Sequence, residues 1–201
     1  QFHEKSGNNI KKEKELLRPG IQELAQTQLK EKLPENEKQL HSLLMTEGDL
    51  AAGDLDIPVE WLETLNREGR VLYLEQGLWI AAEHQEDYRK AVDVKEGERC
   101  LSILRRMLRY RGGSSAAQAA ARYGLPTEIT EELLQELCSR EEAVCTLPDS
   151  QPKPYSHAGN EENAAAEAVY YHAKLYKRAR TKTIKNRREE ITTCPPAAYA
   201  A

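Results

Sequence analysis

The segment 99–140 constrains the fold of this chain more than any other part of its sequence. It reads RCLSILRRMLRYRGGSSAAQAAARYGLPTEITEELLQELCSR and is interrupted at Gly112-Gly113 and at Gly124-Leu125-Pro126. Between these breaks, apolar residues recur at steps of three and four, which predicts amphipathic helices joined by turns. The segment therefore has the order of a helix-turn-helix, which is the core of a winged-helix module.

A first unit of similar order is predicted over residues 37–92. We expect a helix that ends at Gly48 and then two strands around the turn 75–77, which form a hairpin or wing. The other elements expected here are a short helix capped by Asp49 through Leu55, a helix over Val59–Glu68, strands Val71–Leu74 and Leu78–Ala81, and a closing helix over His84–Val92.

The second unit, 98–171, repeats this order after the polar linker 93–97. Ser114 is expected to cap a helix over Ala116–Tyr123, and Pro126 opens the third helix. Wing strands are expected at 143–147 and 168–171, around a long mobile loop over 148–166 that is rich in Pro, Ser, Asn and Gly. A basic helix and the start of a truncated element fill 172–201, and a polar segment with a short helix between Pro19 and Pro34 fills 1–36. The predicted class is mainly α with small β-hairpins (α+β), in tandem winged-helix or helix-turn-helix modules followed by a basic helix.

Composition limits the classes of protein that fit. The chain has 201 residues, of which 39% are hydrophobic and 31% charged, and no apolar run approaches the roughly 18 residues of a membrane helix. It starts without an initiating Met or an apolar signal core and stops inside a new element, so we expect a piece of a longer protein. Four scattered cysteines without a CxxC pair make disulfides unexpected and indicate a reducing, cytoplasmic compartment, with Cys100 and Cys138 as buried thiols.

Motifs of catalysis are absent from the sequence. It contains no phosphate-binding loop, no GxGxxG, no HExxH and no GxSxG. The five histidines do not stand at zinc-ligand spacing from the cysteines. We therefore predict no catalytic residue, no metal site and no cofactor in this fragment.

Two basic clusters are candidates for contact with phosphate. The first lies on the opening helix of the second unit, where Arg105 and Arg109 share a face at i, i+4, and where guanidinium groups suit bidentate phosphate contact. Its alternative is a solvated face paired with glutamates. The candidate residues of this cluster are Arg105, Arg106, Arg109, Arg111 and Arg122.

The second cluster lies on the C-terminal helix. Eight basic and two acidic residues give 174–190 a net charge of +6, which leaves −10 for the rest of a chain whose total is −4. Interleaved tyrosines at 170, 171 and 176 are candidates for stacking on bases. The alternative is a helix docked on an acidic neighbouring domain. The candidate residues of this cluster are Lys174, Lys177, Arg178, Lys185 and Arg188.

The third helix of each unit argues against a sequence-specific DNA reader. In a helix-turn-helix this helix normally enters the major groove. Here it carries glutamates, which phosphates repel. They stand at 60, 63 and 68 in the first unit and at 128, 131, 132 and 136 in the second. The acidic charge of these helices therefore indicates that they contact other protein modules rather than DNA.

Several strings resemble the C-terminal extension of the large helicase-related (Lhr-type) ATP-dependent DNA helicases. The resemblance covers roughly residues 37–199. The strings are Leu40–Leu44 followed by Glu47–Leu50, LWIAAE at 78–83, Ile103–Arg111 with Gly113, AQAAARYGLP at 117–126, KLYKRARTKTIKNRREEI within His172–Glu190, and Cys194–Tyr199. The resemblance implies upstream motor domains that bind ATP and Mg²⁺ and translocate on single-stranded DNA, and a tail of winged-helix modules that serves assembly and, in some members, a DNA glycosylase activity.

Two hypotheses follow. The first is an accessory, non-motor region of a DNA-repair helicase that contacts the DNA backbone, single-stranded or duplex, without base specificity and scaffolds the other domains of the same chain. The alternative is a protein-interaction or oligomerisation module without DNA binding of its own, whose acidic helices grip basic surfaces of sister subunits. Under either hypothesis the fragment itself is not an enzyme, whereas the parent would be an ATP hydrolase.

Overall fold

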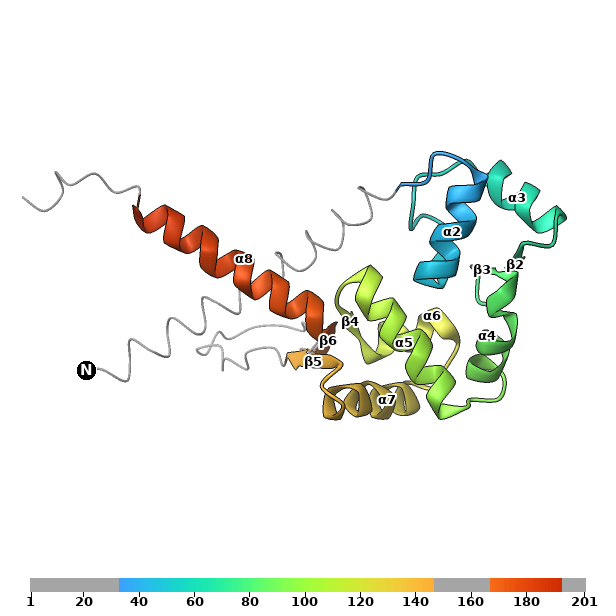
Figure 1. Ribbon diagram of the computed structural model, residues 1–201. Coiled ribbons are helices and arrows are strands. Elements are labelled where there is room, and N and C mark those ends of the chain that lie inside the picture. The colour runs from blue at the N-terminus through green and yellow to red at the C-terminus, as the bar shows by residue number, and fades with distance from the viewer. Residues whose placement is uncertain (1–32, 147–166, 193–201) are drawn as a thin grey trace, which may run out of the picture.

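Figure 1 shows the computed structural model of this protein, which describes residues 33–146 and 167–192. Within these ranges the chain is mainly helical and has two small antiparallel sheets of three strands each. The α+β, mainly α class predicted from the sequence is confirmed. The helix expected between Pro19 and Pro34 and the loop 148–166 lie outside the described residues.

The first unit is a helix–strand–helix–hairpin arrangement. Its sheet has the order β1-β3-β2, in which Trp79 of the middle strand stands opposite Leu50 on one side and Tyr73 on the other. The elements are α2 (Glu37–Glu47), β1 (Asp49–Ala51), α3 (Val59–Arg67), β2 (Val71–Tyr73), β3 (Leu78–Ala81), the 3-10 helix η1 (Ala82–His84) and α4 (Gln85–Val92).

The end of α2 is fixed by Gly48. This residue has φ +100°, a conformation that glycine adopts without steric cost. A Cβ at this position would lie 2.6 Å from Cδ of Arg106 and 2.8 Å from the Tyr88 hydroxyl. Glycine thus lets α2 end against α4 and α5 and turn directly into β1.

The second unit has the full winged-helix order. Its elements follow in the order helix, strand, helix, helix, strand, strand, as in that fold. The strand order in the sheet is β4-β6-β5, and α8 follows the last strand without a loop. The elements are α5 (Gly97–Arg111), β4 (Ser114–Ser115), α6 (Ala116–Tyr123), α7 (Thr127–Ser139), β5 (Ala143–Thr146), β6 (Val169–His172) and α8 (Ala173–Thr192).

The two units share one hydrophobic core. On β3, Leu78 and Ile80 belong to a cluster that also contains Leu104 of α5 and Tyr123 of α6. The opposite face of the same sheet packs on α2 and α3. A strand that is apolar on both faces reads as a continuous apolar run, as LWIA does here. The sheet of the first unit is therefore a middle layer between two sets of helices.

The segment 93–97 closes this arrangement as a tight turn. The backbone N–H of Asp93 donates to the Arg89 carbonyl and that of Glu96 to the Lys90 carbonyl, each at 2.9 Å. These bonds fold α5 back onto α4, and the two helices are in contact. The segment 93–97, whose polar composition suggests a linker, is thus a short solvent-exposed turn between two packed helices.

Two local predictions are wrong. The short helix expected from Asp49 is instead β1, because its residues pair with β3 and the Asp49 side chain bonds to distant residues rather than to its own backbone. The cap of α6 is Ser115, not Ser114. The Ser115 hydroxyl accepts from the Gln118 N–H at 3.2 Å in a capping box, and both serines pair with β6.

Candidate nucleic-acid interface

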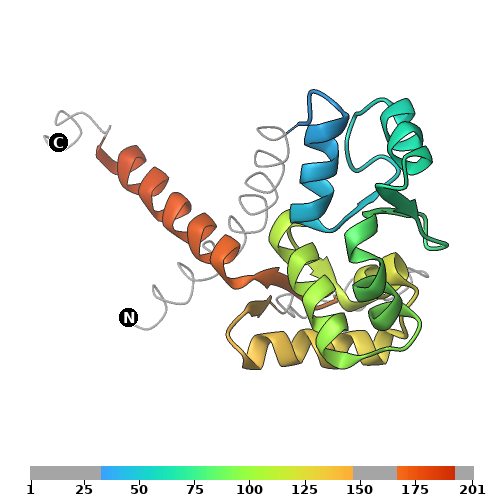
Figure 2. The same cartoon turned by 45° about the vertical axis from the view of Figure 1, so that its right-hand side comes forward.

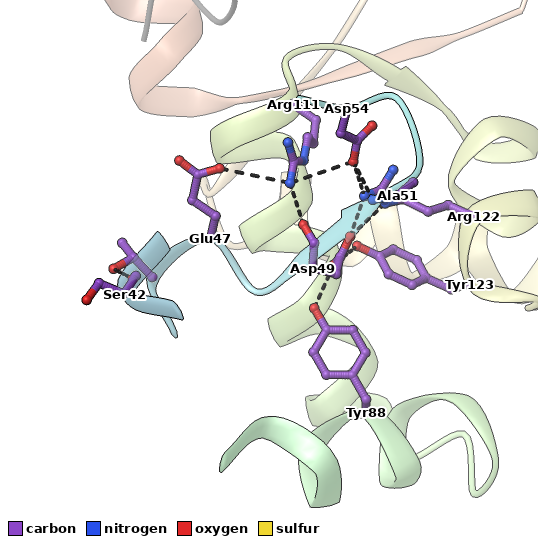
Figure 3. A network of polar contacts seen from close by, with 10 residues as sticks. Ser42, Glu47, Asp49, Ala51, Asp54, Tyr88, Arg111, Arg122 and Tyr123 are labelled. Atoms are coloured by element: carbon purple, nitrogen blue, oxygen red, sulfur yellow. Dashed lines mark hydrogen bonds and ion pairs between the residues drawn. The ribbon is translucent and has the colours of Figure 1, made fainter. Parts of the chain in front are cut away.

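Two of the predicted phosphate-binding arginines lie inside the molecule. Figure 3 shows that Arg122 of α6 and Arg111 of α5 both point toward β1 and the loop that follows it, where Asp54 lies. Arg122 donates to the Asp49 carboxylate at 2.8 Å from Nε and 2.5 Å from Nη2, and to Asp54 at 2.8 Å. Arg111 donates to the backbone carbonyl of Asp49 and lies 3.7 Å from Asp54. These guanidinium groups join the two units.

Asp49 is the centre of this network. Its side chain is almost fully buried and also accepts from the hydroxyls of Tyr88 at 2.6 Å and Tyr123 at 2.9 Å. Burial, and next the Asp49 charge, raise the pKa of both tyrosines well above the ordinary value, so both stay protonated donors. A buried carboxylate with this many donors is fully compensated.

Two charged groups of the network, Asp54 and Arg122, are held in their ionised forms. Burial raises the pKa of Asp54, but the hydrogen bond from Arg122, the charge of Arg111 and the Ala51 N–H outweigh it, and the net pKa is lowered. Burial likewise disfavours the charge of Arg122, yet Asp49 and Asp54 raise its pKa above the ordinary value. Arg122 and Asp54 therefore remain an ion pair at neutral pH.

The remaining arginines of α5 differ in their surroundings. Arg105 forms an ion pair with Glu142 at 2.6 Å, which is the pairing with glutamate considered as its alternative role. Arg106 is half-buried beside Gly48. Arg109 is exposed, and its guanidinium lies 5.4 Å from the centre of the Tyr110 ring. Of this cluster, Arg109 is the member that the structure exposes to solvent.

The second cluster forms an exposed stripe along α8. The spacing 174, 177, 178, 181, 182, 185 places these residues on one side of a helix, and all six side chains are exposed. We call Lys174, Lys177, Arg178, Thr181, Lys182 and Lys185 the α8 stripe. Lys182 was not among the predicted site residues, although its i+4 spacing from Arg178 identifies it. The side chain of Arg188 lies outside what the structure describes.

The stripe stands clear of the winged-helix core. In Figures 1 and 2, α8 leads away from α2–α7 in both views. Leu175 and Ala179, on another side of the helix, are buried in a cluster with Tyr171. Tyr170 and Tyr171 are also buried, so the prediction that they stack on bases is wrong. Tyr176 is half-buried, with its ring centre 6.2 Å from that of Tyr171.

Close packing at Gly113 fixes the root of α8. A Cβ on Gly113 would lie 2.2 Å from Cε1 of Tyr171, so the ring rests directly on the glycine backbone. The Ala173 N–H donates to the Glu142 carbonyl at 2.9 Å, and the Glu142 side chain holds Arg105. The first turn of α8 is thereby tied to α5 and to the start of β5.

His172 caps α8. Its Nδ1 accepts from the Lys174 N–H at 3.2 Å, which requires that nitrogen to be unprotonated. Burial, and then the charges of Arg109 and Lys174, lower the pKa of His172, with Arg105 adding to this and Glu142 opposing it. The neutral imidazole therefore satisfies an N–H of the first helical turn.

We expect this imidazole to make stability depend on pH. Its folded pKa lies below the unfolded value of 6.5, so its contribution is fully present above pH 6.5 and is lost as pH falls toward the folded pKa. NMR titration of the imidazole should give a pKa below 6.5, and His172→Gln should flatten the fall in unfolding free energy below pH 6.5. A His172 pKa at or above 6.5 would contradict this account.

The exposed face of α7 carries the opposite charge. Glu128, Glu131, Glu132 and Glu136 are all exposed there. Arg140 at the end of the helix pairs with Glu136 at 2.8 Å and with Glu98 at 2.7 Å. The helix that reads DNA in other winged-helix proteins is therefore acidic here, as the sequence predicts.

No family model matches this chain, and no curated protein sequence matches it. Among the described residues, no group of three or more His, Cys, Asp or Glu side chains is arranged to hold a metal ion. In the same part of the chain, no helix is long and apolar enough to cross a membrane.

Proposed function

We propose that this chain is an accessory, non-motor winged-helix region of a cytoplasmic ATP-dependent DNA helicase of the large helicase-related type, acting in DNA repair. It contacts the DNA backbone through the α8 stripe and Arg109, and it scaffolds neighbouring domains. ATP and Mg²⁺ belong to motor domains elsewhere in the parent chain. The strings at 78–83 and 117–126 and the winged-helix order of the second unit support the assignment to this class.

The observation that carries the DNA-binding proposal is the exposed α8 stripe. Successive turns of a helix are about 5.4 Å apart, so the stripe offers one or two cations per turn along one side of the helix. Such a row suits the regularly spaced charges of a nucleic-acid strand and carries no pattern that reads bases. The structure engages Arg105, Arg111 and Arg122 with carboxylates of the same chain, so these three are left out of the proposed interface.

Salt dependence tests this proposal directly. Each phosphate that a cation neutralises contributes about −0.9 to the slope of log K against log salt on duplex DNA, and about −0.7 on single strands. Fluorescence anisotropy with labelled oligonucleotides should therefore show a slope that corresponds to several neutralised phosphates, with little difference between sequences. Absence of binding at low salt would contradict the proposal.

Charge reversal on the stripe should weaken this binding. We expect Lys177→Glu with Arg178→Glu to lower affinity ~10-fold or more and to make the salt slope shallower by the contribution of at least two phosphates. The matched control is Lys38→Glu with Arg67→Glu, which makes the same change in net charge at exposed sites on α2 and α3. A stripe variant that binds as well as the control would remove α8 from the interface.

The exposed acidic face of α7 favours a second function, that of a module for protein interaction or self-association. In that case the acidic face of α7 would bind a basic surface on a neighbouring domain or on a second copy of the chain. Light scattering over a range of concentrations separates the two functions. A monomer at all concentrations that binds DNA supports the first, and a concentration-dependent oligomer without DNA binding supports the second.

A further inference from the structure

Two cysteines lie at the corner where α7 turns into β5. Cys138 is in the last turn of α7, and Cys145 is the third residue of β5. The corner is tight, because the Glu141 N–H donates to the Cys138 carbonyl at 3.0 Å and the Glu142 N–H to the Leu137 carbonyl at 2.9 Å. These bonds end the helix and send the strand back along it, so that α7 and β5 are in contact.

The two thiols at this corner differ in their exposure to solvent. Side chains alternate along a strand, so Cys145 shares the side of Ala143, which is buried in the core together with Leu137. Cys138 packs against the same core from α7 and is half-buried. Cys145 lies two residues further along β5 and is exposed. One thiol is thus sheltered and the other accessible.

Tyr170 of β6 is the neighbour of Cys145 across the sheet. Burial raises its pKa, and both Cys145 and Cys138 add to that rise. Burial also raises the pKa of Cys138, with a further contribution from Cys145, while the Cys145 N–H opposes it. The Cys138 sulfur is thus within hydrogen-bond reach of the backbone of Cys145, and Tyr170 stands across the sheet from Cys145.

We propose that Cys138 and Cys145 form a redox-modification site, in which a peroxide joins them in an intrachain disulfide that fastens β5 to α7. Cys145 is accessible and reacts first: its sulfur bonds to one peroxide oxygen, the O–O bond breaks, and water leaves. The Cys138 sulfur then attacks the resulting sulfenic acid. The S–S bond forms, the S–O bond breaks, and the hydroxide leaves with the Cys138 proton as a second water. Two thiols and one peroxide give one disulfide and two waters.

This site is compatible with a reducing compartment, where disulfides form transiently and serve as redox signals. It is also selective within the chain. Cys100 is buried, and its thiol donates to the Ala91 carbonyl at 3.1 Å, so a peroxide does not reach it. The bond would hold together the helix and the strand on either side of the corner, both part of the second winged-helix unit.

Peptide mapping of the full chain after treatment with hydrogen peroxide and alkylation tests the proposal. We expect a peptide pair linked through Cys138 and Cys145, formed in a reaction whose rate does not depend on protein concentration. Cys138→Ser should abolish the link and leave a sulfenic acid on Cys145 that dimedone traps. Cys100→Ser is the matched control and should leave the link unchanged.

Two results would overturn the proposal. One is oxidation of Cys145 alone in the wild-type chain, without a link to Cys138. The other is a link from Cys145 to Cys194 or to a second copy, which a parallel experiment on Cys194→Ser identifies. Circular dichroism of each variant before oxidation shows that it is folded, so that the absence of a link reports on the chemistry of the pair.

Discussion

Replacing Asp49 by Ala should lower the free energy of unfolding by about 3–5 kcal/mol, the cost of removing one partner from a buried ion pair. The substitution removes the carboxylate that accepts hydrogen bonds from the hydroxyls of Tyr88 and Tyr123 and from the guanidinium of Arg122, all in a buried site. Because these donors come from both units, the whole structure is expected to lose stability in one transition. Urea unfolding followed by the fluorescence of Trp61 and Trp79 measures the effect.

Two further variants make this prediction specific. Asp49→Asn preserves the shape of the side chain but removes its charge, and it should still be clearly destabilised because Arg122 then lacks a charged partner. Asp56→Ala changes an exposed aspartate in the same segment and should stay within about 0.5 kcal/mol of wild type. Equal stability of Asp49→Asn and the wild-type chain would show that the network is not required for folding.

Gly113→Ala should destabilise the second unit by about 1–3 kcal/mol, as expected when a methyl group is forced into a filled site. The new Cβ would lie 2.2, 2.8 and 2.9 Å from three carbons of the Tyr171 ring, so the ring must move. Tyr171 leads into α8, and its displacement should loosen the root of that helix. Thermal unfolding and the hydrogen exchange of amides at the start of α8 measure both effects.

A matched glycine and a double-mutant cycle isolate the steric cause. Gly97→Ala meets no atom within 4 Å at the start of α5 and should be neutral or slightly stabilising. In a Tyr171→Ala background, Gly113→Ala should cost much less, because the ring it collides with is absent. An equal cost in both backgrounds would place the strain elsewhere than at Tyr171.

Most helices and the first hairpin of this fold could be predicted from the sequence. A local pattern predicts each of these elements. Apolar residues at helical spacing predict the helix Val59–Arg67, and a short apolar run next to a Gly turn predicts the strand Leu78–Ala81. The strand β1 could not be predicted in the same way. Its three residues form a strand because β3 lies beside them, and a local pattern of capping residue and apolar residues favours a helix there instead.

The residues of the candidate site likewise fall into those that a local pattern predicts and those whose role depends on distant parts of the chain. The α8 stripe follows from helical spacing within one element, so four of its cations were predicted and Lys182 could have been. The roles of Arg111 and Arg122 depend on Asp49, and Arg122 lies 73 residues from it along the chain. No local pattern shows that an arginine will meet a carboxylate so far away. The exposure of a charged group is therefore decided by tertiary packing, which a single sequence does not display.

The direct passage from β6 into α8 has a mechanical consequence. β6 is the middle strand of its sheet and is hydrogen-bonded to β4 on one side and β5 on the other. A helix that begins at the residue after such a strand has no hinge at its base. A force applied to α8 therefore acts on the hydrogen bonds of β6 to both β4 and β5, and α8 moves as a rigid body with this sheet. Whatever pulls on its outer end turns the second winged-helix unit with it, and through the shared core the first unit as well.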